Sequence, residues 1–310
     1  MNVTIVIPNY NGEHIIGRNL NKVIESAKNY SEGEIEIIVS DDNSVDNSVK
    51  EIKDIIAKEK NIRIKLIENS KNLGFSSNVN KAVSEAKNEI IILLNSDVSP
   101  HINFIKPLIA HFSDPDVFAV GCKDESIEAG KIVNRGRGMG KWNKGFLIHR
   151  AGDLNSSTTL WASGGSSAFR KSIWDSLSGL DPLFNPFYWE DIDISYRAQK
   201  AGYKVVFEKN AIVRHEHEKG VIKSNYSDAK IKQIAYRNQF IFIWKNSDLK
   251  TIIFHILWFP YHFLKSLLRI DGSFFKGFFD SLILLPKIVK KRIIVQKSFV
   301  KSDADIINSL

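Results

Sequence analysis

Three segments of the chain place carboxylates directly after apolar runs or at the start of a helical pattern, where they could bind a ligand or transfer a proton. They are Asp41-Asp42 after the apolar run 35–40, Asn95-Ser96-Asp97 after the apolar run 90–94, and Trp189-Glu190-Asp191-Ile192-Asp193 at the start of a helical pattern. A carboxylate at the end of a buried strand is costly unless a hydrogen-bond donor or a cation meets it. These positions therefore indicate ligand binding, metal binding or proton transfer.

The first pair, Asp41 and Asp42, predicts a contact with a nucleobase imide N–H or a ribose hydroxyl, because both groups donate to a carboxylate. Ser44 and Asp46 follow at once and are good capping residues. The alternative is therefore that this segment caps the next helix. Both interpretations stay open, since neighbouring residues could serve each of them.

Asp97 is a candidate ligand of Mg²⁺ or Mn²⁺. These ions prefer oxygen, and Mg²⁺ usually takes only one or two protein carboxylates, with water and substrate phosphates completing its shell. The alternative is an aspartate that begins the turn before Pro100. His215 is a second candidate ligand or a lone surface histidine; His217 would point to the opposite face of an extended chain, so the two could not easily share one ion.

Glu190 and Asp191 predict acid–base chemistry. One of two adjacent carboxyl groups can be kept near neutrality by its neighbour and act as a base. The structural alternative is that acids in a first helical turn complement the helix dipole, with Asp193 and Arg197 as an ordinary i,i+4 pair.

The elements that must position these residues alternate along the chain. β-branched runs at 3–8, 35–40, 62–67, 90–95 and 117–121 alternate with helical patterns, which predicts a parallel sheet covered by helices on both faces. In such sheets ligands bind beyond the carboxyl ends of the strands. Residues 122–187 are irregular and rich in Gly, Ser and Trp, so we expect loops and short strands there that wall a second substrate site, followed by a helix at 191–201 and a strand at 204–207.

Composition limits the class of protein. With 310 residues, 43% of them apolar, the chain can bury one large core and a small appendage. The formal charge of +8 favours an anionic partner. Cys122 is the only cysteine, which excludes an internal disulfide and fits a reducing cytosol. The run 3–7 is too short for a signal peptide, so we expect the chain to begin with a strand.

The C-terminal region changes in character beyond about residue 230. Residues 251–264 carry no formal charge, yet they fall short of the ~20 apolar residues that span a bilayer. Phenylalanine and leucine at 274–285, followed by Lys287, Lys290, Lys291 and Arg292, are typical of a helix that lies in an anionic membrane interface. The alternatives are docking on the protein's own core or a homodimer contact.

Several other functions are disfavoured. The chain has no Walker A sequence, no G-x-S-x-G and no H-E-x-x-H, and the glycines at 136–140 do not link a clear strand to a helix. A nucleic-acid partner is not expected, because the basic and aromatic residues concentrate in the apolar tail. A sugar nucleotidyltransferase and a non-catalytic nucleotide- or glycan-binding protein remain as alternatives.

In this order, the segments resemble family 2 glycosyltransferases of the GT-A fold, especially bacterial rhamnosyltransferase-type members. The resemblance covers residues 3 to 240. It rests on VIPNYNG at 6–12, VSDDNSVDNS at 39–48, NLGFSSNVN at 72–80, LLNSDV at 93–98, ASGGSSAFR at 162–170 and GLDPLFNPFYWEDIDISYRAQKAGYKV at 179–205. One of these motifs would be weak, whereas the ordered set is specific.

The resemblance implies a role for each matching position. The nucleotide-sugar site would include Pro8, Asn9, Tyr10, Asp42, Gly74, Phe75, Asn95 and Ser96, with Asp42 on the pyrimidine. Asp97 and His215 would hold the cation, Asp191 would be the base with Glu190 orienting the acceptor, and Trp189 and Gly164 would contact the acceptor. One departure is that Asn95 occupies the first position of the family's D-x-D motif, so that a single carboxylate, Asp97, would anchor the ion.

The implied protein is an inverting glycosyltransferase that uses Mn²⁺ or Mg²⁺. The resemblance favours dTDP-rhamnose as donor, then UDP-sugars, and a glycan or lipid-linked acceptor in cell-surface polysaccharide synthesis. It implies a GT-A domain at 1–240, with a nucleotide-sugar half at 1–121 and an acceptor half at 122–240. We expect residues 241–310 to form an amphipathic, basic helical extension, and the protein to be cytoplasmic and peripheral on the cytoplasmic face of the cell membrane.

Overall fold

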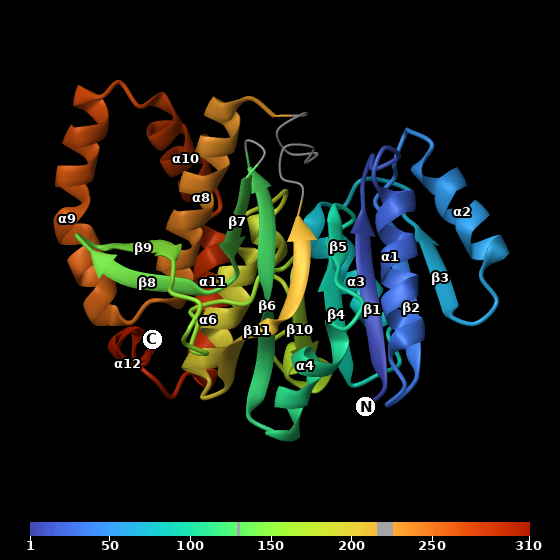
Figure 1. Ribbon diagram of the computed structural model, residues 1–310. Helices are drawn as coiled ribbons and strands as arrows, with labels where there is room; N and C mark the ends of the chain where they lie inside the picture. The colour runs from blue at the N-terminus through green and yellow to red at the C-terminus, as the bar shows by residue number, and fades with distance from the viewer. Residues whose placement is uncertain (129–130, 216–225) are drawn as a thin grey trace.

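The computed structural model describes residues 1–128, 131–215 and 226–310. A central sheet has helices on both faces, and a group of helices packs beyond one edge of the sheet (Figure 1). The strands of the main sheet are β1 (Val3–Asn9), β2 (Ile35–Asp41), β3 (Arg63–Glu68), β4 (Ile90–Leu94), β5 (Val98–Pro100), β6 (Val117–Glu128), β7 (Lys131–Arg135), β10 (Ser166–Arg170) and β11 (Lys204–His215). The predicted α/β class is confirmed.

The order of strands in the sheet is β3-β2-β1-β4-β10-β6-β11-β5, with β7 paired to β6. β3, β2, β1 and β4 are parallel, as predicted, whereas β10 is antiparallel to both of its neighbours, β4 and β6. The irregular stretch 122–187 thus contributes a central strand. Ser166 and Ser167 in β10 lack the β-branched side chains that mark a buried strand in sequence, so the pattern could not reveal it.

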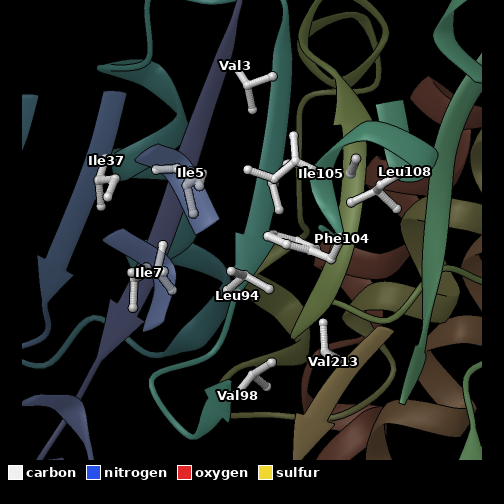
Figure 2. Close-up of a cluster of buried hydrophobic side chains, with 14 of the residues drawn as sticks. Val3, Ile5, Ile7, Ile37, Leu94, Val98, Phe104, Ile105, Leu108 and Val213 are labelled. Atoms are coloured by element: carbon white, nitrogen blue, oxygen red, sulfur yellow. The ribbon is translucent and has the colours of Figure 1, made fainter. Parts of the chain in front are cut away.

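Two hydrophobic clusters lie on the two faces of this sheet. One packs α1 (Ile16–Asn29), α2 (Ser48–Lys58) and α4 (Ile105–Ala110) against inward residues such as Ile5 and Ile92. Figure 2 shows this cluster, where side chains of β1, β2 and β4 meet Phe104 and Leu108. The other packs α3 (Phe75–Ser84), α5 (Lys171–Ser176) and α6 (Glu190–Lys200) against Val6 and Leu93. Burial on both faces holds the strand ends in fixed register.

The C-terminal helices share a third cluster with the hairpin β8 (Gly138–Asn143) and β9 (Phe146–Ala151). They are α8 (Asp228–Asn246), α9 (Leu249–Leu268), α10 (Gly272–Ile283), α11 (Leu285–Val295) and α12 (Asp303–Asn308). Residue 240, the predicted domain boundary, lies inside α8, and Phe240 and Phe242 are fully buried. α9 lies at the outer edge of the molecule, where the hairpin reaches it (Figure 1). Among the described residues, no helix is long and apolar enough to cross a membrane.

Candidate active site

The loops that follow β1, β2 and β4 meet at the carboxyl end of the parallel strands. β1 and β2 pair from Val3 with Ile35 to Asn9 with Asp41, so both strands end together. Asn9 Nδ2 donates to Asp41 Oδ1 at 2.8 Å, and Pro8 beside it is buried, whereas Tyr10 is 36% exposed. The register of two parallel strands therefore places the first two predicted loops side by side.

Asp41 stabilises its own loop. Its carboxylate accepts from Asn9 Nδ2, from Ser44 N at 2.9 Å and from Ser44 Oγ at 2.6 Å. The helix α2 begins further on, after Asn47, and Asp46 accepts from Ser48 N at 3.0 Å at its start. Asp41 and Asp46 thus stabilise the loop and the start of α2, as the capping alternative predicted. Asp42 remains the ligand-binding candidate of the pair.

Asp42 holds the turn that follows β3. Its Oδ1 accepts from Asn69 Nδ2 at 3.0 Å and from Leu73 N at 2.9 Å, and its Oδ2 accepts from Gly74 N at 2.9 Å. The φ angle of Gly74 is +82°, which favours glycine. A carboxylate has about four acceptor positions, and three of these are used, so one position on Oδ2 remains for a ligand donor.

The loop after β4 lies beside the start of β10. Asn95 N donates to Gly165 O at 2.9 Å, and Ser96 O accepts from Asn19 Nδ2 at 2.9 Å. The side-chain oxygen Asn95 Oδ1 is buried and accepts no hydrogen bond from the described residues. A buried amide oxygen in this state is suited to a cation or a ligand donor.

Asp97, His215 and Asp124 form a carboxylate–imidazole–carboxylate chain. His215 Nε2 lies 3.1 Å from Asp97 Oδ2, and its Nδ1 lies 3.2 Å from Asp124 Oδ2. Burial lowers the pKa of His215, but the hydrogen bonds and charges of both aspartates outweigh it and raise the pKa to about 10. His215 is therefore protonated at neutral pH in this arrangement, and it must lose that proton before it can bind a metal.

The sequence did not indicate Asp124, because the expected strand ended at residue 121 whereas β6 continues to Glu128. Glu216 and His217 lie outside the described residues. Within the described part of the chain, no group of three or more His, Cys, Asp or Glu side chains could hold a metal ion. The oxygens of Asp97 and Asn95 fit a divalent cation that takes most of its ligands from water and a diphosphate.

The acid pair stands at the amino end of α6. Glu190 is 8% exposed, and its Oε2 is buried with no hydrogen-bond partner among the described residues. Burial, the charge of Asp191 and the charge of Asp193 raise the pKa of Glu190 well above its ordinary value. Burial also raises the pKa of Asp191, although the backbone N–H groups of Ile192 and Gly164 oppose this rise. Glu190 thus holds a proton more firmly, and Asp191 is the group that ionises first.

Asp191 lies beside the loop that precedes β10. Gly164 N lies 3.4 Å from Asp191 Oδ2. A Cβ on Gly164 would lie 3.4 Å from Phe75 Cε1 and 3.5 Å from Asp191 Cβ, so Gly164 packs between the start of α3 and the acid pair. Trp189 is 6% exposed, and its ring contacts His149 of β9 at 5.3 Å. The fold therefore brings Phe75, Gly164, Trp189 and the acid pair together.

Asp193, the third acid of this turn, is structural. It is fully buried and accepts from Arg197 Nε at 2.8 Å and from Asn246 Nδ2 at 2.7 Å, and Lys245 Nζ lies 2.6 Å away. Its interaction with Arg197 is therefore one part of a buried network that ties α6 to α8, rather than an ordinary surface pair. Arg197 was visible from its spacing, whereas Lys245 and Asn246 were not.

The sequence of this chain is similar to those of known glycosyltransferases. Residues 4–177 match the sequence profile of the family described as glycosyl transferase family 2. The O-antigen chain rhamnosyltransferase RfbN of Salmonella typhimurium is 29% identical over 70% of this chain and 67% of its own length. The pre-mycofactocin glycosyltransferase of Mycobacterium tuberculosis is 25% identical over 69% of this chain and 43% of its own length.

Two solved structures share the fold. GalNAc-T7 with UDP, GalNAc and Mn²⁺ has a TM-score of 0.62 and 20% identity, over 79% of this chain and 48% of that one. TarS residues 1–349 of S. aureus with UDP-GlcNAc has a TM-score of 0.60 and 16% identity, over 99% of this chain and 89% of that one. The chain thus spans about half the length of GalNAc-T7 and less than half of the mycobacterial relative.

Proposed function

The chain belongs to glycosyl transferase family 2 and has the GT-A fold, and on this basis we propose that it transfers a sugar, with inversion, from a nucleoside-diphosphate donor to a hydroxyl group of a glycan or lipid-linked acceptor. The observation that carries the proposal is Asp191 beside Gly164, which in turn packs against Phe75. A partly buried carboxylate with a raised pKa, close to a loop suited to a nucleotide, is equipped for proton transfer rather than for packing alone.

In the proposed reaction, Asp191 accepts the proton of the acceptor hydroxyl. The freed electron pair of that oxygen forms a bond to the anomeric carbon, while the bond from this carbon to the donor phosphate oxygen breaks, and its electrons leave with the diphosphate. Attack opposite the leaving group inverts the anomeric centre. Burial and the charge of Asp191 raise the pKa of Glu190, and in its protonated form Glu190 can donate a hydrogen bond that orients the acceptor.

A divalent cation would be held by Asp97, with Asn95 Oδ1 beside it in the chain. When bound, Mn²⁺ or Mg²⁺ supplies positive charge to the leaving diphosphate. Asp124 holds His215 against Asp97, so we propose that His215 shares this site and can itself offer positive charge to the phosphates. The related fold in GalNAc-T7 contains Mn²⁺, which supports a divalent metal as cofactor.

For the donor we propose dTDP-rhamnose first and UDP-sugars next, supported by the similarity to the Salmonella O-antigen rhamnosyltransferase. The test is transfer from a panel of nucleotide sugars with Mn²⁺ to saccharide acceptors, with the anomeric configuration of the product read by NMR. We expect release of a nucleoside diphosphate and an inverted product. Pyrophosphate release from a nucleoside triphosphate and a sugar phosphate would instead identify a nucleotidyltransferase, and binding without turnover would identify a non-catalytic relative.

We further propose that the C-terminal helices lie on an anionic membrane surface. On α9, the outward residues at spacings of three and four are strongly exposed, with Leu257 at 71% and Leu268 at 85%. The other members of this apolar face are Ile253, Ile256, Leu264 and Leu267. An apolar helical face of this size fits the headgroup boundary of a bilayer.

The charge of the C-terminal helices supports an anionic surface as the partner of this face. Residues 249–295 contain the acids Asp271 and Asp280 and the basic residues Lys250, Lys265, Arg269, Lys276, Lys287, Lys290, Lys291 and Arg292. Of these, Lys291 binds the buried Asp181 and Arg292 donates to Trp244 O, so the other six are the ones that can meet an anionic surface. Four basic residues, Lys230, Lys232, Arg269 and Lys276, line a hollow of about 680 Å³ beside the end of α9. Basic residues near an apolar face bind anionic headgroups.

The test is cosedimentation with vesicles of phosphatidylcholine, with and without phosphatidylglycerol. We expect binding that needs phosphatidylglycerol and is lost in the double variant Leu257→Glu, Leu264→Glu. Ile132→Glu, which places the same charge on the exposed residue Ile132 of β7, is the matched control and should bind normally. The native protein could instead bind neither kind of vesicle and sediment as a dimer, with the double variant sedimenting as a monomer. In that case the face is a homodimer contact and the membrane proposal is wrong.

A further inference from the structure

The turn that leads into the acid pair has an unusual backbone. Tyr188 and Trp189 have φ angles of +73° and +75°, and both are bulky residues other than glycine. They immediately precede Glu190, the first residue of α6. Residues with side chains rarely adopt this conformation, and it persists only where the surrounding structure enforces it. Contacts from other elements must therefore hold this turn.

Helix α8 supplies one set of these contacts. Asn238 is fully buried, and its Nδ2 lies 2.9 Å from Phe184 O, 2.9 Å from Phe187 O and 2.8 Å from Tyr188 O. Its Oδ1 accepts from Arg237 Nε at 2.9 Å, which fixes the orientation of the amide. The two N–H groups of one side-chain amide thus lie within hydrogen-bond distance of three carbonyl oxygens of the turn that ends at the acid pair, so one N–H is shared between two of them.

The donor-side loop holds the same turn from its other side. Asn185 Nδ2 donates to Leu73 O at 2.9 Å and to Ser77 Oγ at 3.0 Å, and its Oδ1 accepts from Ser76 N at 3.0 Å. Arg237 Nη2 donates to Asn185 O. Residues 184–189, which we name the acid-pair turn, therefore connect α8 to the loop that Asp42 also holds.

We propose that Asn238 is a positioning residue: it holds the acid-pair turn in its strained conformation and so places Glu190 and Asp191 for reaction. This inference rests on the proposed function of the acid pair. Asn185 has the complementary task, because it joins the turn to residues 73–77. Loss of Asn238 should therefore disturb the acids, whereas loss of Asn185 should disturb the nucleotide loop.

The first test compares the steady-state kinetics of Asn238→Ala and Asn185→Ala. For Asn238→Ala we expect kcat to fall by roughly 10²-fold, because small displacements of a reacting group have effects of this size, while the KM for the donor stays within about twofold. For Asn185→Ala we expect the larger change in donor KM. Gln233→Ala is the matched control, since it removes a different α8 side chain whose amide reaches Asp280 of α10, and it should leave both constants unchanged.

A second test asks whether Asn238 acts through the strained backbone. Glycine adopts positive φ without strain, so Tyr188→Gly should reduce the need for the restraint. We expect Asn238→Ala to lower kcat less in the Tyr188→Gly background than in the native chain, which a double-mutant cycle measures. Equal losses in both backgrounds, or an unchanged kcat in Asn238→Ala, would overturn the proposal.

Hydrogen exchange read by mass spectrometry separates this inference from the proposed function. We expect Asn238→Ala to speed exchange in residues 187–192, with unchanged exchange in β1 and β4. If native protein transfers no sugar but the exchange result holds, the proposed function is wrong and the restraint is real. If Asn238→Ala does not fold, Asn238→Ser replaces it, and unaltered exchange in 187–192 in that variant would remove Asn238 from this role.

Discussion

The two pairs of adjacent acids differ in how their charges are satisfied. Asp41 and Asp42 each accept three hydrogen bonds, Asp41 from Asn9 and from Ser44 of its own loop and Asp42 from the loop after β3, in the region that the donor is proposed to occupy. Glu190 has a buried oxygen with no partner in the described structure, and burial raises the pKa of both Glu190 and Asp191.

This difference separates two uses of the same residue type. A carboxylate that accepts several hydrogen bonds from the protein can hold a loop in place. A buried carboxylate with few donors is destabilised as an anion and gains from taking up a proton. We therefore expect changes at Asp42 to affect donor binding and changes at Asp191 to affect turnover.

The largest expected effect is that of Asp191→Asn. A general base contributes ~10²- to 10⁴-fold to the rate, or about 3 to 5 kcal/mol of barrier, so kcat should fall by that factor while donor affinity changes little. Rapid-mix turnover assays and calorimetric titration of the donor measure the two quantities. Asp175→Asn, at an exposed acid of α5, is the control. Native turnover in Asp191→Asn would abolish the contrast between the two pairs.

Asp42→Asn should show the opposite pattern. The amide group of asparagine would face N–H donors that the carboxylate now accepts, and an unsatisfied buried group costs about 1 to 3 kcal/mol. The 73–74 turn should loosen, so that thermal unfolding occurs at lower temperature and the donor KM rises, whereas kcat at saturating donor changes much less. Asp54→Asn on the exposed side of α2 should change none of these. A fall in kcat alone would place Asp42 among the reacting groups.

The sequence predicted the parts of this comparison that depend on local patterns. Strands at 3–8 and 35–40 correspond to β1 and β2, and the rule that ligands bind at the carboxyl ends of parallel strands led to Asp42 and Asp97. These positions are readable because each loop follows its strand directly. The start of α6 at Glu190 was also within one residue of the predicted helix.

The partners of these residues could not be predicted from the sequence. Asn238 is separated by fifty residues from Tyr188, whose carbonyl it holds, and Asp124 lies ninety-one residues from His215. Nothing in the apolar and polar spacing of α8 or β6 marks these two side chains as contacts of the site. Such contacts arise only when distant elements pack. The hydrogen-bond partners of a charged side chain, and hence its role, can therefore be read only from the folded structure.

A smaller effect tests the same principle on a histidine of the C-terminal region. His255 is 2% exposed, its Nδ1 lies 2.8 Å from Gly145 O, and its Nε2 accepts from Trp244 Nε1 at 3.2 Å. These contacts satisfy the neutral ring only, since a proton on Nε2 would face the indole N–H, and burial lowers the pKa of His255 to about 4. The folded chain therefore resists protonation that the unfolded chain accepts near pH 6.5.

The free energy of unfolding is therefore unaffected by His255 above pH 6.5, and it falls as the pH drops from 6.5 towards 4. Between pH 7 and pH 5 we expect a loss of about 2 kcal/mol from His255 alone. Denaturant unfolding of the native chain and of His255→Gln at both pH values measures it, because the other titrating groups cancel in the comparison. An equal pH-dependent loss in both proteins would show that His255 is not held neutral.

The smallest expected effect is a shift in the pH dependence of kcat. Asp191 must be ionised to accept a proton, and burial raises its pKa, so turnover should fall on acidification with a midpoint above the ~3.9 of an ordinary aspartate. Glu190 and Asp191 titrate as a pair, and ionisation of Glu190 at higher pH should give a second inflection. Glu190→Gln keeps a neutral group beside Asp191 and should remove that second inflection only.

The control is Asp42→Asn in the Asp41–Asp42 pair. It should leave the acid limb of the pH profile in place, because Asp42 is not the group that is proposed to take up the acceptor's proton. A midpoint at or below the ordinary aspartate value, or an acid limb that moves in Asp42→Asn, would show that the charge state of Glu190 and Asp191 does not govern kcat.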